Sequence, residues 1–242
     1  MPTILSNKKD INNWTKLDGF QSNTVNVTWA TQSAPDNDNR RVVYGDDKFV
    51  AIGTKDGLQS HIITSPDGIT WTAQTVPEAT ASWFGIAYAN NMYVATATIG
   101  NGRVMTSPDA ITWTSHSIGT KNGWYAVTYG SGTWVAVATI LPGNDNNRVM
   151  TSSDATSWSS RSVDFTGGAS VSAWKSITYA DSIFVAVANS GTHRSIYSSD
   201  GVVWQTGSIA ANRQWWSVTY GKDKAWLGRT FLRYPYFRLL VQ

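Results

Sequence analysis

The 242-residue chain contains no cysteine, three histidines and a single glutamate, Glu78. The absence of cysteine excludes disulfides, thiolate metal sites and cysteine nucleophiles. His61, His116 and His193 are scattered without the spacing of metal ligands, so we predict neither a metal nor a cofactor. The acidic residues outside the turns form no obvious pair for glycoside hydrolysis, and we predict no catalytic residue.

Long hydrophobic runs and strong charge are also missing. No segment approaches the roughly 18 apolar residues of a membrane span, and the first residues, MPTILSNKKD, lack the apolar stretch of a signal peptide. We therefore expect no membrane insertion and no signal-directed export, which is compatible with a virion, a phage particle or the cytoplasm. The net charge of +3 arises from residues 222–242, which carry five cations and one acid. The nearly neutral remainder argues against nucleic-acid binding.

One motif, Ser-x-Asp followed by Trp four residues after the Asp, occurs four times. The carboxylate of such an Asp accepts hydrogen bonds from turn amides, a small residue after it permits a tight backbone, and the Trp packs on the strands. We therefore predict structural roles for Asp67, Asp109, Asp154 and Asp200. Asp10, four residues before Trp14, is a weaker copy. The four copies are SPDGITW (65–71), SPDAITW (107–113), SSDATSW (152–158) and SSDGVVW (198–204).

A second module accompanies each copy of this motif and has the pattern of a β-hairpin. An apolar run ends at a Tyr, a short turn such as Gly-Asp-Asp or Ala-Asn-Asn follows, and a second apolar run begins. The Tyr positions 44, 88, 129, 179 and 220 are 41 to 50 residues apart, close to the ~40–45 residues of a four-stranded propeller blade. We predict an all-β protein, a five-bladed β-propeller of four-stranded antiparallel blades that forms one domain over residues 1–242.

The two ends of the chain are each predicted to hold half a blade. Asp10 to Trp14 matches the turn between a third and a fourth strand, and the last hairpin begins at Trp215. Pairing of these halves would close the ring and remove two exposed sheet edges. Residues 229–242 depart from every repeat, and we expect an extra strand, an interface for a protein partner, or the remnant of a longer repeat array.

The repeated turn resembles the Asp-box, or BNR, repeat of sialidases and related propellers. The copies here are one residue shorter, similar to repeats of phage-tail and bacterial-surface propellers. The resemblance implies a propeller whose Asp boxes lie on the blade periphery, remote from the ligand. It leaves the function open, because such repeats serve hydrolases, lectins and assembly factors.

Two residue types recur where the connections between strands vary most in length. A Trp starts the first strand of four repeats and a basic residue starts the third strand. Aromatic faces stack on sugar rings, and guanidinium groups bind hydroxyls and carboxylates. This pattern favours a binding face for a glycan or a cell-surface receptor. The candidate ligand-binding residues are Trp83, Trp124, Trp174, Trp215, His61, Arg103, Arg148 and Arg194.

The same residues also permit a structural interpretation, in which the Trp side chains wedge between blades and the Arg side chains bind loop carbonyls. Phe84, Tyr125 and Trp216, one residue further on, are expected to point the opposite way and to pack within the blades. We predict a non-catalytic carbohydrate- or receptor-binding module that gains avidity from repeated weak sites. Two alternatives remain open, a protein-assembly propeller and a sialidase-like glycosidase.

Overall fold

The computed structural model describes most of the chain from residue 38 onward. The described residues are 30, 32–35, 38–55, 59–78, 80–119, 122–139, 148–163, 172–191, 193–207, 213–221, 224–231 and 234–240. The chain divides into the units Met1–Gln32 and Ser33–Gln242, and we describe the second. The predicted strands around Asp10 and Trp14 lie outside the described residues, so the single domain over the whole chain stays a prediction.

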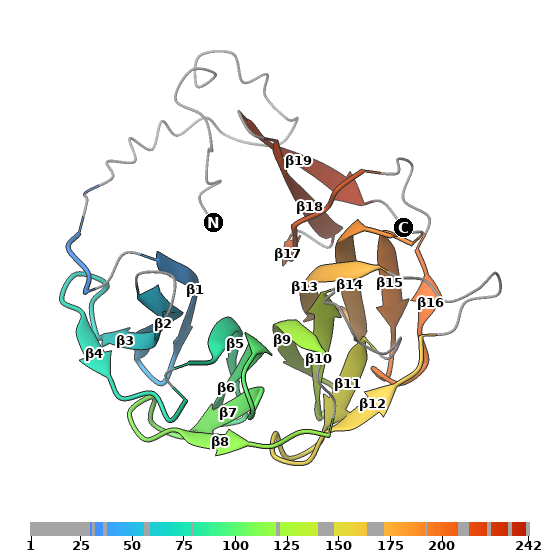
Figure 1. Cartoon of the computed structure of the whole chain (residues 1–242). Helices are drawn as coiled ribbons and strands as arrows, with labels where there is room; N and C mark the ends of the chain where they lie inside the picture. The colour runs from blue at the N-terminus through green and yellow to red at the C-terminus, as the bar shows by residue number, and fades with distance from the viewer. Residues whose placement is uncertain are drawn as a thin grey trace. The chain divides into compact units, whose positions relative to one another are not determined.

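The described part of Ser33–Gln242 is all-β and forms five antiparallel sheets, four with four strands and one with three (Figure 1). Strands pair in chain order, so neighbouring strands are joined as hairpins. The first strands of successive sheets contact one another, and we call the sheets blades 1 to 5. Blade 1 contains β1 (Asp38–Gly45), β2 (Lys48–Lys55), β3 (Gln59–Ser65) and β4 (Thr72–Gln74); blade 2 contains β5 (Ser82–Ala89), β6 (Met92–Ile99), β7 (Val104–Ser107) and β8 (Thr114–His116); blade 3 contains β9 (Gly123–Gly130), β10 (Thr133–Thr139), β11 (Val149–Ser152) and β12 (Ser159–Arg161); blade 4 contains β13 (Ala173–Ala180), β14 (Ile183–Ser190), β15 (Ser195–Ser198) and β16 (Gln205–Thr206); blade 5 contains β17 (Ser217–Gly221), β18 (Lys224–Phe231) and β19 (Tyr234–Leu240).

The first hairpin of each of blades 1 to 4 turns through two residues with positive φ. In blade 1 these are Asp46 and Asp47, with φ of 46° and 54°. Two consecutive left-handed residues form the turn whose twist matches that of the flanking strands. Asp, Asn and Gly tolerate this backbone better than other residues, which explains the turn sequences. The other three pairs are Asn90–Asn91, Ser131–Gly132 and Asp181–Ser182.

The repeated Asp turns follow the third strand of blades 1 to 4 and are held by their own side chains. In blade 2, Oδ1 of Asp109 accepts hydrogen bonds from the amides of Thr112 (2.7 Å) and Ile111 (2.8 Å) and from the Ser107 hydroxyl (2.9 Å). The indole Nε1 of Trp113 donates to the Ala110 carbonyl at 3.0 Å. The same bonds recur in the other blades around Asp67, Asp154 and Asp200.

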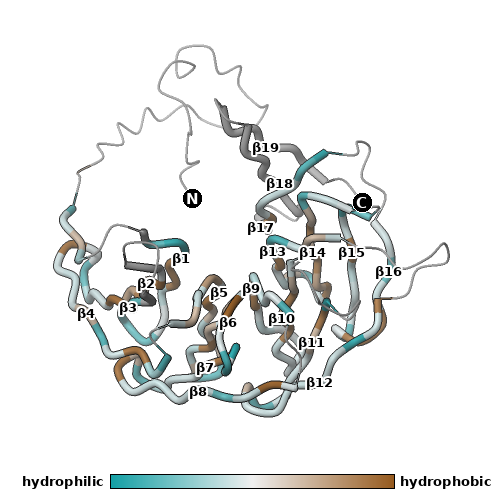
Figure 2. Tube along the Cα trace, in the orientation of Figure 1, coloured by the Kyte–Doolittle hydropathy of each residue, from teal (hydrophilic) through white to brown (hydrophobic). Residues whose placement is uncertain are grey.

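The core lies between the blades, because each cluster of buried residues draws on two neighbouring sheets. Trp83 of blade 2 shares a cluster with Val50 and Ile52 of blade 1. Trp174 of blade 4 shares one with Val135 of blade 3. The second strands are therefore covered on both faces and are nearly continuous in apolar residues. Figure 2 shows the hydrophobic segments along the strands of blades 2 to 4.

The packing of a tyrosine ring on a glycine is a second kind of contact between blades. A Cβ at Gly45 would overlap the ring of Tyr88, and a Cβ at Gly130 would overlap the ring of Tyr179. In each case the Tyr belongs to the first strand of the following blade and the Gly ends the first strand of the preceding one. Only glycine allows this approach. In blade 1 the equivalent Tyr44 is 56% exposed.

Blade 5 differs from the pattern because its third strand comes from the C-terminal residues. β19 pairs antiparallel with β18 from Ala225–Leu240 to Phe231–Tyr234. Of the expectations for residues 229–242, the structure therefore shows the extra strand. This strand occupies the edge of β18 to which the N-terminal half-blade was expected to pair. The N-terminal half-blade itself lies outside the described residues, and closure of a five-bladed ring stays a prediction.

Candidate functional site

The four tryptophans predicted to bind a ligand are buried between blades. Trp83, Trp124 and Trp215 have no exposed surface, and Trp174 retains 1%. A side chain without exposed surface cannot stack on a ligand, so the structural interpretation is the correct one for these residues. The Trp residues fill the space against the preceding blade.

Two of the four basic residues predicted to accompany them, Arg103 and Arg194, bind backbone carbonyls near the ends of the preceding second strands. Nη1 of Arg103 donates to the carbonyls of Thr98 (2.6 Å) and Asn122 (2.9 Å). Nη1 of Arg194 donates to the carbonyl of Asn189. His61 and Arg148 are 6% and 3% exposed, and Nε2 of His61 lies 2.7 Å from Oδ1 of Asn39. None of the four lines the pocket described below.

A β-bulge follows the start of the first strand in blades 1 to 4. In β5, Trp83 pairs with Ala97 and Gly85 pairs with Thr96, which leaves Phe84 as an extra residue. A bulge bends the strand and re-aims the extra side chain. The corresponding extra residues of β1, β9 and β13 are Arg40, Tyr125 and Lys175.

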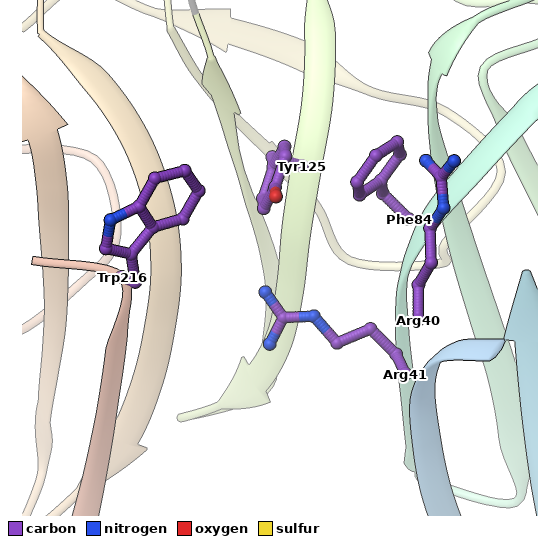
Figure 3. Close-up of a pocket in the computed structure, with 5 residues that line it drawn as sticks. All are labelled: Arg40, Arg41, Phe84, Tyr125 and Trp216. Atoms are coloured by element: carbon purple, nitrogen blue, oxygen red, sulfur yellow. The ribbon is translucent and has the colours of Figure 1, made fainter. Parts of the chain in front are cut away.

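Three of these bulge residues, Arg40, Phe84 and Tyr125, line a pocket of about 470 Å³ (Figure 3), and the fourth, Lys175, lies beside it against Tyr125 and Trp216. Its lining consists of Arg40, Arg41, Phe84, Tyr125 and Trp216, contributed by blades 1, 2, 3 and 5. Because they lie at or next to the beginning of the first strand, the pocket lies on the side where the connections between blades enter. Phe84, Tyr125 and Trp216 were expected to pack within the blades, and this expectation was wrong.

Aromatic and cationic side chains contact one another in sequence around the pocket. The guanidinium carbon of Arg40 lies 4.0 Å from the centroid of the Phe84 ring, whose centroid lies 4.6 Å from that of Tyr125. The ammonium nitrogen of Lys175 lies 4.1 Å from the Tyr125 centroid and 5.3 Å from that of Trp216. Each cation faces a ring at a distance typical of cation–π interaction.

Arg41 of blade 1 contacts blade 4, although these two blades are not consecutive in the sequence. Its Nη2 donates to the carbonyl of Lys175 at 3.0 Å, and its guanidinium carbon lies 5.9 Å from the centroid of the Tyr125 ring. In Figure 3 the Arg41 guanidinium extends toward Tyr125 and Trp216. The hydrogen bond to the Lys175 carbonyl holds the Arg41 guanidinium at the pocket.

Burial changes the proton affinity of two lining residues, Arg41 and Tyr125, and of Lys175 beside the pocket. It lowers the pKa of Lys175 to about 8 and lowers the pKa of Arg41. It also raises the pKa of the Tyr125 phenol, against the opposing effect of the Arg41 charge. Loss of hydration disfavours the charged form of each group. None of the described residues that line the pocket carries a carboxylate.

Among the described residues, no group of three or more His, Cys, Asp or Glu side chains could hold a metal ion. No helix in the described part of the chain is long and apolar enough to cross a membrane. The described residues that line the pocket offer cationic and aromatic side chains.

Comparison with solved structures identifies the type of fold. The chain is similar to virginiamycin B lyase from Staphylococcus aureus, with a TM-score of 0.65, 13% identity and coverage of 82% of this chain and 69% of that one. It is also similar to a streptogramin B lyase, with a TM-score of 0.63, 15% identity and coverage of 83% and 68%. These neighbours are β-propellers, and the chain has a propeller-type fold.

A third neighbour is YCF48 bound to a D1 peptide, with a TM-score of 0.55 and 11% identity. The match covers 80% of this chain and spans 62% of the length of that neighbour. No family model matches the sequence. No curated protein matches it either. At these identities the likeness establishes the fold alone.

Proposed function

We propose that this propeller is a non-catalytic binding module that recognises a saccharide presented by a glycan or a cell-surface receptor. The saccharide would bind in the pocket lined by Arg40, Arg41, Phe84, Tyr125 and Trp216, which we call the central pocket. The observation that carries the proposal is the set of aromatic and cationic side chains that line the pocket at or next to the starts of the first strands. Phe84, Tyr125 and Trp216 are half-buried, so each is held in place and keeps accessible surface. Rigid aromatic faces beside hydrogen-bond donors are suited to the apolar face and the hydroxyl groups of a sugar.

This proposal differs from the repeated weak sites expected from sequence. The pocket is shared by several blades, whereas the buried Trp recurs once in each of blades 2 to 5 and the basic residue once in each of blades 1 to 4. A volume of about 470 Å³ is within the ~300–1,000 Å³ of small-molecule sites. The proposal is therefore one central site for each chain.

Binding is favoured over hydrolysis by the composition of the pocket. Glycoside hydrolysis needs two carboxyl groups on either side of the scissile bond, and the lining residues that the structure describes include none. Glu78 is engaged elsewhere, because its carboxylate accepts hydrogen bonds from the Gly102 amide (2.8 Å) and the Ser115 hydroxyl (2.9 Å). Incubation with fluorogenic glycosides, including a sialoside, tests this part of the proposal, and turnover would contradict it.

A second candidate function is recognition of a protein partner. The propeller neighbour YCF48 has been solved with a D1 peptide, and Arg40 and Arg41 could receive an acidic or C-terminal carboxylate of a peptide. The strand formed by the C-terminal residues, β19, is a second candidate surface for a protein partner. A pull-down of acidic peptides with no saccharide binding would favour this function.

The experiment for the main proposal is a glycan array probed with the parent protein and with Tyr125→Ala and Trp216→Ala. Each substitution is expected to lower the signal of the bound glycan about tenfold or more, since a contacting aromatic is worth roughly 1–3 kcal/mol. Tyr197→Ala is the matched control, because Tyr197 is 37% exposed on β15 and does not line the pocket. No glycan bound by the parent, or equal binding by all four proteins, would sink the proposal.

We also propose that blades 1 and 5 close a five-bladed ring. Val42 and Tyr44 of β1 are 61% and 56% exposed, at positions whose counterparts in the next blade pack against the preceding blade. Gly221 ends β17 as Gly45 ends β1. Tyr44 on Gly221 would thus repeat the contact of Tyr88 on Gly45. Trp216 of blade 5 and Arg40 of blade 1 already line one pocket.

A further inference from the structure

We propose that the ligand of the central pocket is an acidic saccharide, whose anionic group binds between the Arg41 guanidinium and the Lys175 ammonium. This inference rests on the proposed saccharide-binding function and adds the chemical class of the ligand. The anionic group is a carboxylate or a sulfate, which present the same oxygen acceptors to the two cations. Neutral saccharides are correspondingly poor ligands.

The first argument is that Arg41 at the pocket and Lys175 beside it have only neutral partners among the residues that the structure describes. Arg41 donates to the Lys175 carbonyl at 3.0 Å, and the Lys175 ammonium donates to Oγ1 of Thr139 at 2.8 Å. The ion pair within the described residues, Lys48–Asp46, lies elsewhere. Cations removed from water without a counter-charge are costly. An anionic ligand would supply that charge.

The second argument is the way in which the two cations are held. Lys175 is 9% exposed, and its ammonium group lies against two aromatic rings and a hydroxyl. Arg41 reaches the backbone of the same residue from blade 1. Both groups therefore have little freedom left to lose on binding, and both lie near the Tyr125 ring. Preorganised donors lower the entropic cost of capturing an anion.

The third argument is the presence of ring faces beside the charges. The Tyr125 ring contacts Phe84, with ring centroids 4.6 Å apart, and the Lys175 ammonium, 4.1 Å from its centroid. The same ammonium lies 5.3 Å from the centroid of the Trp216 ring. A ligand with an anionic group attached to a ring would place that group at the cations and its apolar face on an aromatic side chain. Uronic acids and sulfated sugars combine these two parts.

The test is calorimetric titration of the full chain with oligogalacturonate, a sulfated heparan oligosaccharide and a neutral galacto-oligosaccharide of matched length. At least one acidic probe is expected to bind roughly 10- to 100-fold more tightly than the neutral one in low salt, as for a charged hydrogen-bonded pair. Arg41→Gln and Lys175→Met should each remove most of this preference. Arg161→Gln is the charge-matched control, because Arg161 bonds Thr151 on the outer strands of blade 3 and should leave it unchanged.

The pH dependence separates a charge effect from a loss of packing. Burial lowers the pKa of Lys175 to about 8, so affinity for the acidic probe should fall as the pH rises from 7 to 9. Lys175→Arg, which remains charged in this range, should retain binding and lose the pH dependence. A circular dichroism melt of every variant checks that it is folded.

The outcomes distinguish this inference from the function on which it rests. Equal binding of acidic and neutral probes, with Tyr125→Ala still harmful, would overturn the acidic class and keep the saccharide site. Binding of an acidic peptide and of no saccharide would overturn both. Acidic binding that Arg41→Gln and Lys175→Met leave intact would place the anion elsewhere and overturn the inference.

Discussion

The ammonium group of Lys175 lies over the ring of Tyr125, 4.1 Å from its centroid, although the two residues belong to different blades. Both are the extra residues of β-bulges, and in both the preceding residue is a Trp buried against the preceding blade. Two consecutive residues of the first strand therefore have different roles. The Trp packs between the blades, and the bulge residue after it lies at or beside the pocket.

This division of roles predicts different results for neighbouring substitutions. Trp83→Ala should lower the free energy of unfolding by about 3–5 kcal/mol, as for other buried aromatics. Phe84→Ala, at a half-buried position, should cost about 1 kcal/mol and act mainly on binding. Urea unfolding of both variants provides the measurement. Equal losses of stability would contradict the assignment.

Lys175 should make stability depend on pH in the alkaline range. Burial lowers its pKa in the folded protein to about 8, against about 10.4 in an unfolded chain. Between these values the unfolded chain binds a proton that the folded protein has released, so the free energy of unfolding rises with pH. Urea unfolding at pH 7, 8, 9 and 10 should show this rise in the parent and a smaller one in Lys175→Met. Identical pH profiles would exclude a perturbed Lys175.

The Asp turns should contribute to acid resistance. Hydrogen bonds from the amides of Thr112 and Ile111 lower the pKa of Asp109 to about 2. The stabilisation is therefore complete above about pH 4 and is lost as the pH falls toward 2. Asp109→Ala should cost about 1 kcal/mol at pH 7, as for removal of a helix-capping residue. Asp109→Asn, which keeps an acceptor oxygen without the charge, should cost less and weaken the pH dependence between 4 and 2.

Ring closure can be tested with cysteines because the chain has none of its own. The variant Tyr44→Cys/Gly221→Cys should form an intramolecular disulfide on mild oxidation, seen as faster migration on a non-reducing gel. Tyr179→Cys/Gly130→Cys is the positive control, since the Tyr179 ring packs directly on Gly130 in the structure. Tyr44→Cys/Gly130→Cys is the negative control. A closure pair that behaves like the negative control would contradict a ring of five blades.

The repeated sequence motifs allowed most of the fold to be predicted from the sequence. The spacing of the Tyr residues and the two-residue turns predicted the hairpins, and blades 1 to 4 have the predicted four antiparallel strands. The third strand of blade 5 was harder to assign, because YPYFRLL has no counterpart in the other repeats. Its pairing with β18 depends on contacts along the strand that no repeat pattern encodes.

The candidate site was placed one residue too early, and the bulges explain why. Sequence alternation assumes a regular strand, whereas the bulge between Trp83 and Gly85 interrupts the pairing register. The prediction that Trp83 faced the opening and Phe84 the blade therefore had the two sides exchanged. One signal was present: the residue after the repeated Trp is Phe, Tyr, Lys or Trp. Large side chains at one repeated position, with no common type, are typical of a shared pocket more than of repeated packing.

The most direct measurement is a crystal structure of the protein with the acidic oligosaccharide that binds best. The sugar should occupy the central pocket, with its carboxylate or sulfate within hydrogen-bond distance of Arg41 and Lys175 and its ring against Tyr125 or Trp216. A saccharide bound at the loops around Arg103 and Arg194, with the pocket empty of sugar, would contradict the assignment of the bulge residues as the binding site.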